Sequence, residues 1–460
     1  MFNKNSTICA LSTPQGIGAI GVVRLSGLDA IKITNVIFKG KDLDQQPSHT
    51  VHFGKIMKDD VLLDEVVVSI FKEPNSYTGE NISEISCHGS PFIINEIIQL
   101  LISKGSVSAA PGEFTLRAFL NGKLDLSQAE AVADLISSDS KNAHKIAMHQ
   151  LRGGFSNEIS VLRQQLIDFA SLIELELDFS EEDVEFANRD QLEALIIKTR
   201  SVLNTLIDSF SVGNAIKNGI PVAIVGKPNA GKSTLLNTLL NEDKALVTEI
   251  AGTTRDSIED EINLEGTNFR FIDTAGIRDT NDIVESLGVK RTLEKIESAS
   301  IVILLFDLTN SNVAQLKETV NEIKPALDKN DAELLMVGNK IDLNTLEKTK
   351  LEYQEIEDVL FISAKEKWNI EELQQKLIET SNLHQLTKNE TIVSNIRHWD
   401  ALTKADQALL KGLTGLKQNV SADFIAMDIR ASLYQLGLIT GEITTDDLLG
   451  NIFSRFCIGK

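Results

Sequence analysis

The stretch GKPNAGKS, from Gly226 to Ser233, fits the phosphate-binding pattern G-x-x-x-x-G-K-[ST]. An apolar run typical of a buried strand, Ile220–Val225, precedes it, and Thr234–Leu240 has the pattern of a helix. A strand, a glycine-rich loop and a helix N-terminus together surround phosphate oxygens with backbone N–H groups and the positive end of the helix dipole. We therefore expect Lys232 to reach the β- and γ-phosphates of a nucleotide and the Ser233 hydroxyl to hold Mg²⁺.

Three further segments follow in the order that a guanine-nucleotide switch requires, each after an apolar strand. They are Asp273–Gly276 (DTAG) after Phe269–Ile272, Asn339–Asp342 (NKID) after Leu334–Val337, and Ser363–Lys365 (SAK) after Val359–Ile362. The aspartate of the first can hold Mg²⁺ through water, and its glycine N–H can meet the γ-phosphate. Asp342 can accept two hydrogen bonds from guanine, whereas adenine lacks that pair of donors. The third is similar to loops that close over the base, so the four motifs together predict a GTPase.

The candidate first switch, Thr248–Asp256, is similar to that of the translation-factor-related bacterial GTPases, and a threonine hydroxyl in it would complete the Mg²⁺ shell. Ile277 stands where Ras-like enzymes carry a glutamine that orients the attacking water. Because isoleucine forms no hydrogen bonds, another group must position the water. A monovalent cation near Asn229 and the first switch could stabilise the transition-state charge in place of an arginine finger.

The composition predicts a cytoplasmic protein without a membrane segment. No apolar run in the 460 residues reaches the roughly 18 residues of a membrane span, and the N-terminus lacks the pattern of a signal peptide. Three cysteines far apart in sequence, Cys9, Cys87 and Cys457, indicate neither disulfides nor a metal cluster. The formal net charge of −21 argues against nonspecific RNA binding over the whole surface, but it does not exclude a local basic face or a basic partner subunit.

The length predicts about three domains. Residues 1–118 carry short strands and read as an α+β domain, and their expected elements are Ala19–Leu25, Glu65–Phe71, Ile82–His88 and a helix after Pro91. Residues 119–214 and 381–460 are patterned as the two parts of a helical domain, and residues 215–380 carry the nucleotide-binding motifs. The predicted fold class is multidomain, with an α+β N-terminal domain, an all-α helical domain and an inserted α/β P-loop GTPase domain.

Two signals support the helical parts. Ser127–Glu130 matches a capping box that opens a helical segment from Leu124 to about Phe210. Apolar residues then recur at helical spacing, at Phe155, Ile159, Leu162, Leu166, Phe169 and Ile173. The acidic run Ser180–Asp183 is expected to interrupt the pattern as a solvated loop, and helical patterning returns from about Ile392 to Phe456.

Several longer segments resemble those of the bacterial and organellar tRNA modification GTPases of the MnmE (TrmE) family. The matching segments are Gly21–Gly27 (GVVRLSG), Tyr77–Glu80 (YTGE), Pro111–Asp125 (PGEFTLRAFLNGKLD), Ile250–Asp256 (IAGTTRD) and Phe456–Lys460 (FCIGK). The resemblance covers essentially the full length of the chain. The proline-glycine-glutamate run and the terminal tetrapeptide discriminate much better than a P-loop does.

The resemblance implies a specific function. Family members work with a flavin-containing subunit, MnmG, as a heterotetramer, and add an aminomethyl or carboxymethylaminomethyl group to C5 of the wobble uridine of certain tRNAs. A tetrahydrofolate derivative such as 5-formyltetrahydrofolate carries the one-carbon unit. The N-terminal domain binds it and forms a constitutive homodimer.

The resemblance also assigns residues. The folate-binding positions fall on Arg24, Glu84, Lys123 and Lys460; cations suit the glutamate tail of folate, and a carboxylate suits the pterin N–H groups. The implied K⁺ ligands are Asn229, Thr248, Ile250 and Thr253, the Mg²⁺ ligands are Ser233 and Thr254, and the water-positioning acid is Glu285. The implied GTP-binding residues are Asn229, Ala230, Gly231, Lys232, Ser233, Thr234, Thr248, Glu249, Ile250, Ala251, Gly252, Thr253, Thr254, Asp273, Thr274, Ala275, Gly276, Asn339, Lys340, Asp342, Ser363, Ala364 and Lys365.

Some positions depart from the family pattern or carry no assigned role. Ser90 replaces a glycine, which puts the local geometry near the folate pocket in doubt. Cys457 is interpreted as a small apolar residue packed in the core, and His88 and His144 as structural residues without evident partners.

Two alternative functions are weighed against tRNA modification. One is a GTP-dependent RNA-binding or ribosome-assembly switch without modification chemistry, which a basic KH-type tail or a second P-loop would support; the sequence has neither. The other is a folate enzyme regulated by its GTPase domain, for which the N-terminal part offers no convincing nucleophile or base.

Overall fold

The computed structural model describes residues 6–178, 189–243, 260–272, 293–330, 332–356, 358–381, 391–418 and 420–459. The chain divides into two compact units. The first contains residues 1–137, 147–203 and 400–460, and the second contains residues 138–146 and 204–399. Most of the second unit is therefore inserted in sequence between two stretches of the first, as expected for a multidomain chain.

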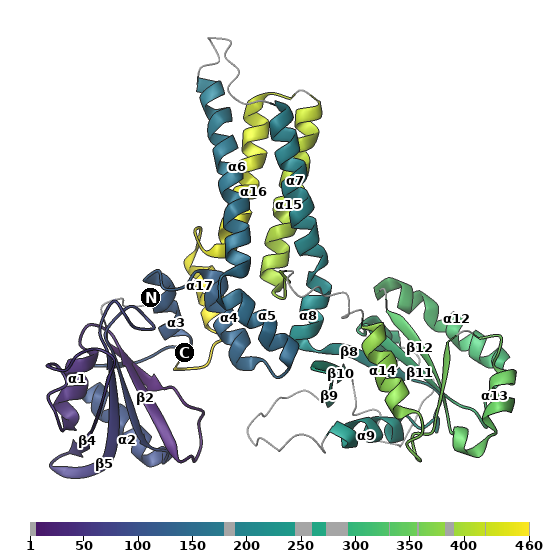
Figure 1. The fold of residues 1–460 in the computed structure, drawn as a ribbon, viewed down its shortest axis with the longest axis horizontal. Coiled ribbons are helices and arrows are strands. Elements are labelled where there is room, and N and C mark those ends of the chain that lie inside the picture. Colours follow the sequence, from purple (N-terminus) through teal and green to yellow (C-terminus); the bar gives the residue numbers. More distant parts are fainter. Residues whose placement is uncertain are drawn as a thin grey trace. The chain divides into compact units, whose positions relative to one another are not determined.

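A seven-stranded sheet forms the N-terminal part of the first unit (Figure 1). Its strands are β1 (Ile8–Leu11), β2 (Ile20–Ser26), β3 (Phe38–Lys39), β4 (Thr50–Lys58), β5 (Val61–Phe71), β6 (Ile82–His88) and β7 (Val107–Ser108), in the order β3-β4-β5-β6-β2-β1-β7. Neighbours pair antiparallel except β1 with β7. The strand expected at Ile82–His88 is confirmed to the residue, whereas β5 begins four residues before the expected Glu65.

Two helices, α1 (Ala30–Ile37) and α2 (Pro91–Ser103), pack against one face of this sheet. The proline that begins α2 lacks an N–H that the first helical turn would leave unpaired anyway. Strand residues that alternate toward the helices, such as Val23, are buried. Arg24 therefore points to the opposite face, where Glu84 is its direct cross-strand neighbour.

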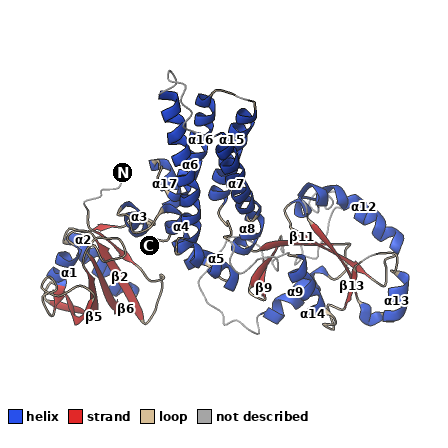
Figure 2. Cartoon of the chain, turned by 45° about the horizontal axis from the view of Figure 1, so that its top comes forward, coloured by secondary structure: helices blue, strands red, loops and turns tan. Residues whose placement is uncertain are grey.

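Helices make up the rest of the first unit. The short helices α3 (Glu113–Leu120), α4 (Leu126–Ser137) and α17 (Asp446–Phe453) share an apolar core. Four longer helices lie alongside one another in Figures 1 and 2: α6 (Gly154–Asp178), α7 (Arg189–Asp208), α15 (Ile396–Lys417) and α16 (Ala422–Thr440). Five of the six periodic apolar residues predicted for α6 are buried, namely Phe155, Ile159, Leu162, Leu166 and Ile173. The ion pair from Arg200 to Asp406, at 2.8 and 3.1 Å, joins α7 to α15.

The predicted capping box at the start of α4 is wrong by two residues. The reciprocal bonds join Asp125 and Gln128: the Gln128 N–H donates to Asp125 Oδ1 (2.8 Å), and the Asp125 N–H donates to Gln128 Oε1 (2.9 Å). Aspartate caps a helix as well as serine does, so the sequence allows a capping box at either position, Asp125–Gln128 or Ser127–Glu130. Ser127 lies buried inside the first turn instead.

The second unit is built on a six-stranded sheet in the order β13-β12-β11-β8-β10-β9. Figure 2 draws its strands in red and labels β9, β11 and β13. The strands are β8 (Ile220–Val225), β9 (Asp260–Leu264), β10 (Thr267–Phe271), β11 (Ile301–Asp307), β12 (Glu333–Asn339) and β13 (Val359–Ile362), and only β9 is antiparallel. The chain order reverses at β8, which lies between β10 and β11. Open α/β sheets bind ligands at such a point, beyond the carboxyl ends of the strands.

Helices cover both faces of this sheet. The core on one face includes α9 (Lys232–Asp243) and α14 (Ile370–Thr380), and the core on the other includes α12 (Val313–Asn330). The remaining described helices are α5 (Lys141–Leu151), which begins in this unit and ends in the first, α8 (Phe210–Asn218), the 3₁₀ helix η2 (Ile341–Leu343) and α13 (Leu346–Glu352). The α/β class predicted for this part is confirmed. None of the described helices is long and apolar enough to cross a bilayer.

Candidate functional site

The loop between β8 and α9 approaches neighbouring strands closely at two glycines. Gly226 has a φ of 153° and Gly231 a φ of 99°. A Cβ on Gly226 would lie 2.0 Å from the Leu305 carbonyl oxygen, and one on Gly231 would lie 2.3 Å from Asn339 Nδ2. The two glycines of the motif are thus required where the loop meets β11 and β12.

Lys232, the first residue of α9, folds back over this loop. Its Nζ donates to the carbonyl oxygens of Gly226 (2.8 Å) and Lys227 (3.1 Å). Ser233 and Thr234 follow it in the first turn of α9, at the positive end of the helix dipole. A cation held over a glycine-rich loop at the N-terminus of a helix is an arrangement that binds phosphate.

Asn339 connects three of the predicted motifs. Its side chain is buried at the end of β12, where Nδ2 donates to the Ala230 carbonyl (2.8 Å) and Oδ1 accepts from the Ala364 N–H (3.0 Å). Thr238 Oγ1 in α9 donates to the Ala364 carbonyl from the other side (2.8 Å). One side chain therefore fixes the loop after β8 against the loop after β13.

The remaining residues of the base-recognition motifs surround that connection. Asp342 is half-buried in η2, directly after β12. Ser363 is fully buried, and its Oγ accepts from the Glu366 N–H at 3.1 Å. Lys365 is exposed and forms an ion pair with Glu366.

Asp307 belongs to this site, although no motif indicated it. It ends β11, and its carboxylate accepts a bond of 2.7 Å from Lys340 Nζ. Burial alone would raise the pKa of Asp307, but bonds from Lys340, Thr309 and Asn310 outweigh it and lower the pKa below its usual value. A signal was present in the sequence: Asp307 ends an apolar strand, as the aspartate of the DTAG motif does.

Several predicted residues lie outside the described residues. They are the first-switch segment from Thr248 to Thr254, the segment from Asp273 to Gly276, Ile277, Glu285 and Lys460. Their proposed roles in binding Mg²⁺, K⁺, water and folate remain predictions.

In the first unit, Arg24 and Glu84 form an ion pair, with Arg24 Nε donating to Glu84 Oε1 at 2.8 Å. The guanidinium carbon lies 5.7 Å from the ring centres of both Tyr77 and Phe114. Tyr77 is tied in turn to Thr115 by a bond of 2.9 Å between their hydroxyl oxygens. The sequence interpretation assigned the cation and the carboxylate to opposite ends of folate; the structure instead joins them as one pair.

Lys123 lies near the loop that carries Tyr77. A Cβ on Gly79 of this loop would lie 3.3 Å from Lys123 Cε, so the lysine stem packs against the glycine. Asn121 Nδ2 also donates to the Thr78 carbonyl at 2.8 Å. Three of the four residues predicted to bind folate are therefore held by strands β2 and β6, α3 and this loop.

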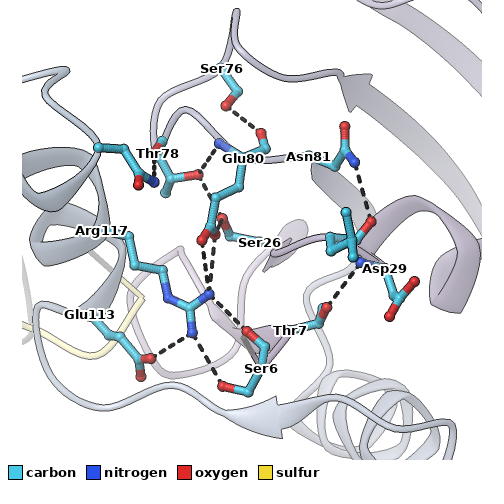
Figure 3. A network of polar contacts seen from close by, with 12 residues as sticks. Ser6, Thr7, Ser26, Asp29, Ser76, Thr78, Glu80, Asn81, Glu113 and Arg117 are labelled. Atoms are coloured by element: carbon cyan, nitrogen blue, oxygen red, sulfur yellow. Dashed lines mark hydrogen bonds and ion pairs between the residues drawn. The ribbon is translucent and has the colours of Figure 1, made fainter. Parts of the chain in front are cut away.

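A buried arginine joins these elements (Figure 3). Arg117 of α3 donates through Nη1 to both carboxylate oxygens of Glu80 (3.2 and 3.1 Å) and through Nη2 to Glu113 Oε1 (2.9 Å). Nη1 also donates to the Ser6 carbonyl (2.8 Å), and Ser26 Oγ donates to Glu80 Oε2 (2.7 Å). Arg117 is 5% exposed, so this network fixes the Tyr77–Glu80 loop against α3 and β2 from inside the protein.

Comparison with known proteins identifies the chain. The family model described as "GTP-binding protein TrmE N-terminus" matches residues 7–123, and the one described as "MnmE helical domain" matches residues 126–457. The tRNA modification GTPase MnmE of Flavobacterium johnsoniae is 58% identical over 468 residues, covering 100% of both chains. The chain belongs to the MnmE family of tRNA modification GTPases.

Two other relatives agree. The MnmE of Cytophaga hutchinsonii is 56% identical and covers 100% of this chain and 98% of its own, and that of Bacteroides fragilis is 52% identical and covers 99% and 100%. The resemblance inferred from the sequence is thus confirmed, as is the prediction of a GTP-hydrolysing enzyme.

Three interpretations of single residues were wrong. His88 has a partner: its Nδ1 lies 2.7 Å from Oδ1 of the buried Asp64 on the neighbouring strand. Cys457 is exposed and not packed in the core. Ser90 has φ of −83° and ψ of 125°, extended values that serine adopts without strain, so it does not disturb the start of α2.

The other two cysteines, Cys9 and Cys87, are buried. Burial, followed by the negative charge of Asp64, raises the pKa of Cys87 to about 11. Burial also raises the pKa of Cys9. Both thiols are therefore protonated at neutral pH and have a structural role.

Proposed function

We propose that the chain hydrolyses GTP in a K⁺-dependent reaction and, with a flavin-containing MnmG subunit, adds an aminomethyl or carboxymethylaminomethyl group to C5 of the wobble uridine of certain tRNAs. The observation that carries the nucleotide part is the side chain of Asn339. It joins the phosphate-binding loop at Ala230 to the base-recognition loop at Ala364. This bond pattern and the 56–58% identity to tRNA modification GTPases over the full length of the chain together support a GTPase that acts on tRNA.

The residues of the second unit fit GTP and Mg²⁺. Gly226 and Gly231 let the loop pack directly against β11 and Asn339, where any Cβ would collide, and so fix the path of the backbone that would surround the phosphates. Lys232 would hold the β- and γ-phosphates, Ser233 and Thr254 would hold Mg²⁺, and Asp342 would accept from the guanine N–H groups. Mg²⁺ would neutralise charge between the phosphates.

Asn229 supports the K⁺ proposal. It has a φ of 62° within the loop, a left-handed conformation that asparagine adopts more readily than most residues, and its side-chain oxygen can serve as a ligand to a cation. With Thr248, Ile250 and Thr253 it would hold K⁺, whose charge would replace that of an arginine finger. Glu285 would position the attacking water, a role that Ile277 cannot fill.

The first unit fits the carboxylates and N–H groups of a tetrahydrofolate. Within the described residues the Arg24 guanidinium bonds to protein only through Nε, which leaves its Nη groups for an acceptor on the ligand. Glu84 keeps a second carboxylate oxygen for ligand N–H groups, and Lys123 and Lys460 would bind the glutamate tail. 5-Formyltetrahydrofolate or a related form would carry the one-carbon unit.

We further propose a homodimer through the N-terminal domain, within residues 1–118, and a heterotetramer with MnmG in the cytoplasm. The remaining proposed domains are residues 119–214 and 381–460 for the helical domain and 215–380 for the GTPase domain. A chain with a net charge of −21 needs a basic surface elsewhere to hold tRNA, so the partner would supply most of it.

GTP turnover in KCl and in NaCl at equal ionic strength tests the catalytic proposal. K⁺ should stimulate turnover by about tenfold or more, because the cation stabilises charge that develops in the transition state. Glu285→Ala should remove this stimulation while GDP binding persists. Equal rates in the two salts would contradict the K⁺ mechanism and favour an RNA-binding switch without modification chemistry.

A further inference from the structure

Asp307 lies at the carboxyl edge of the sheet in the second unit. All seven residues of β11, from Ile301 to Asp307, are buried, so the strand is packed on both faces up to its last residue. Leu308, which follows it, donates its N–H to the Asn339 carbonyl at 3.1 Å, and Asn344 Nδ2 donates to the Leu308 carbonyl at 3.2 Å. The turn after β11 is thereby bonded to both ends of the segment Asn339–Asn344, which contains Lys340 and Asp342.

The carboxylate of Asp307 accepts four hydrogen bonds. Oδ1 accepts from the N–H and the hydroxyl of Thr309, at 2.9 and 2.7 Å. Oδ2 accepts from Asn310 Nδ2 at 3.1 Å and from Lys340 Nζ at 2.7 Å. The two oxygens have different roles, because Oδ1 bonds only within the turn, whereas Oδ2 reaches across to the residue after β12.

Lys340 is held at both ends. Its backbone has a φ of 70°, a left-handed conformation that is unfavourable for lysine. Its ammonium group is fixed on Asp307, and a third of its side chain is exposed. The methylene stem between these two fixed points forms an apolar surface two residues before Asp342.

We propose that Asp307 is a positioning residue for nucleotide recognition: it holds the stem of Lys340 as one wall of the guanine site. The inference rests on the proposed role of Asn339–Asp342 in binding the base. A planar base is bound by apolar surfaces against its faces as well as by hydrogen bonds at its edge, and a lysine stem supplies such a surface only when its ammonium group is held elsewhere. Asp307 therefore sets the affinity for the nucleotide and leaves the rate of the chemical step unchanged.

The substitution Asp307→Asn separates the two oxygens. The asparagine oxygen still accepts both bonds from Thr309, so the turn keeps its internal bonds, but its NH₂ group replaces the acceptor that faces Lys340 and Asn310. We expect the Kd for GDP to rise about tenfold, because the Lys340 side chain is no longer held in the free protein and binding of the nucleotide has to immobilise it. We expect kcat at saturating GTP to stay within about twofold of the wild-type value, since the phosphate-binding groups are untouched.

A double-mutant cycle with Lys340→Met distinguishes positioning from a general structural defect. If Asp307 acts through Lys340, Asp307→Asn should cost no further affinity in the Lys340→Met background. Asp358→Asn is the matched control, because Asp358 forms an exposed ion pair with Lys376 in the same unit. It should bind GDP like the wild type.

Three outcomes would overturn the inference: an unchanged Kd in Asp307→Asn, losses that add in the double variant, or a fall in kcat without a change in Kd. Asp342→Ala identifies a failure of the underlying assignment. If Asp342→Ala weakens GDP binding but Asp307→Asn does not, only the inference about Asp307 fails. If neither substitution has an effect, the base does not bind at Asn339–Asp342.

Discussion

Asn339→Ala is expected to weaken the binding of GDP and GTP by about a hundredfold. Without the amide, two buried backbone groups lose their partner, the free loops shift to pair them again, and binding must reverse that shift at about 1–3 kcal/mol for each group. The groups are the carbonyl of Ala230 and the N–H of Ala364. Both belong to loops that would contact the nucleotide, one at the phosphates and the other at the base. Without the amide between them, the two loops are no longer fixed at the spacing that the nucleotide requires.

Titration with a fluorescent GDP analogue measures this loss directly. Asn237→Ala is the matched control, because Asn237 is exposed on α9 in the same unit. The control should bind as the wild type does. An Asn339→Ala variant with wild-type affinity would show that the two loops are held together by other contacts.

Arg117→Met is expected to lower the free energy of unfolding of the first unit by about 3–5 kcal/mol, since it leaves the buried Glu113 and the half-buried Glu80 without their counterion. Among the residues that the structure describes, Glu80 would keep only the hydroxyl of Ser26 as a donor, and Glu113 only the N–H of Ala110. Binding of 5-formyltetrahydrofolate should weaken as well, because the Tyr77–Glu80 loop loses its attachment to α3.

Urea unfolding followed by circular dichroism gives the stability of this variant. Lys32→Met is the control: Lys32 pairs with Asp29 on the surface, and its removal should change little. Adding Glu80→Gln and Glu113→Gln to Arg117→Met should restore part of the loss, because it removes the uncompensated charges. A single Arg117→Met variant as stable as the wild type would contradict the importance of the network in Figure 3.

The nucleotide-binding half was predictable because its signals are local. A phosphate-binding loop needs glycines at fixed spacing, and each motif follows an apolar strand whose ends the sequence marks; β8 and β13 begin and end where expected. Asp307 was missed because its role depends on Lys340, which is 33 residues away in sequence and directly follows the neighbouring strand β12. No short pattern records a pair that only the sheet order brings together.

The errors in the first unit also arose because a short stretch of sequence does not show what a residue contacts in the folded chain. His88 was expected to have no partner because Asp64 is 24 residues away, and only the proximity of β5 and β6 brings the two together. The capping box at α4 was misplaced because Asp125–Gln128 and Ser127–Glu130 both have the residue types and spacing of such a box. The choice between them depends on what the helix packs against. Cys457 was expected in the core on residue type alone, which does not decide exposure near a chain end.

The most direct test of the central claim is the C5 modification of wobble uridine in a bacterial strain that lacks its own MnmE. Total tRNA from this strain, carrying either the wild-type chain or Lys232→Ala, would be digested and its nucleosides measured by mass spectrometry. We expect the wild-type chain to restore the modified uridine and Lys232→Ala to restore almost none, because the cation at the phosphate-binding loop is lost. Full restoration by Lys232→Ala, or none by the wild-type chain, would contradict the proposal that GTP hydrolysis at this site drives tRNA modification.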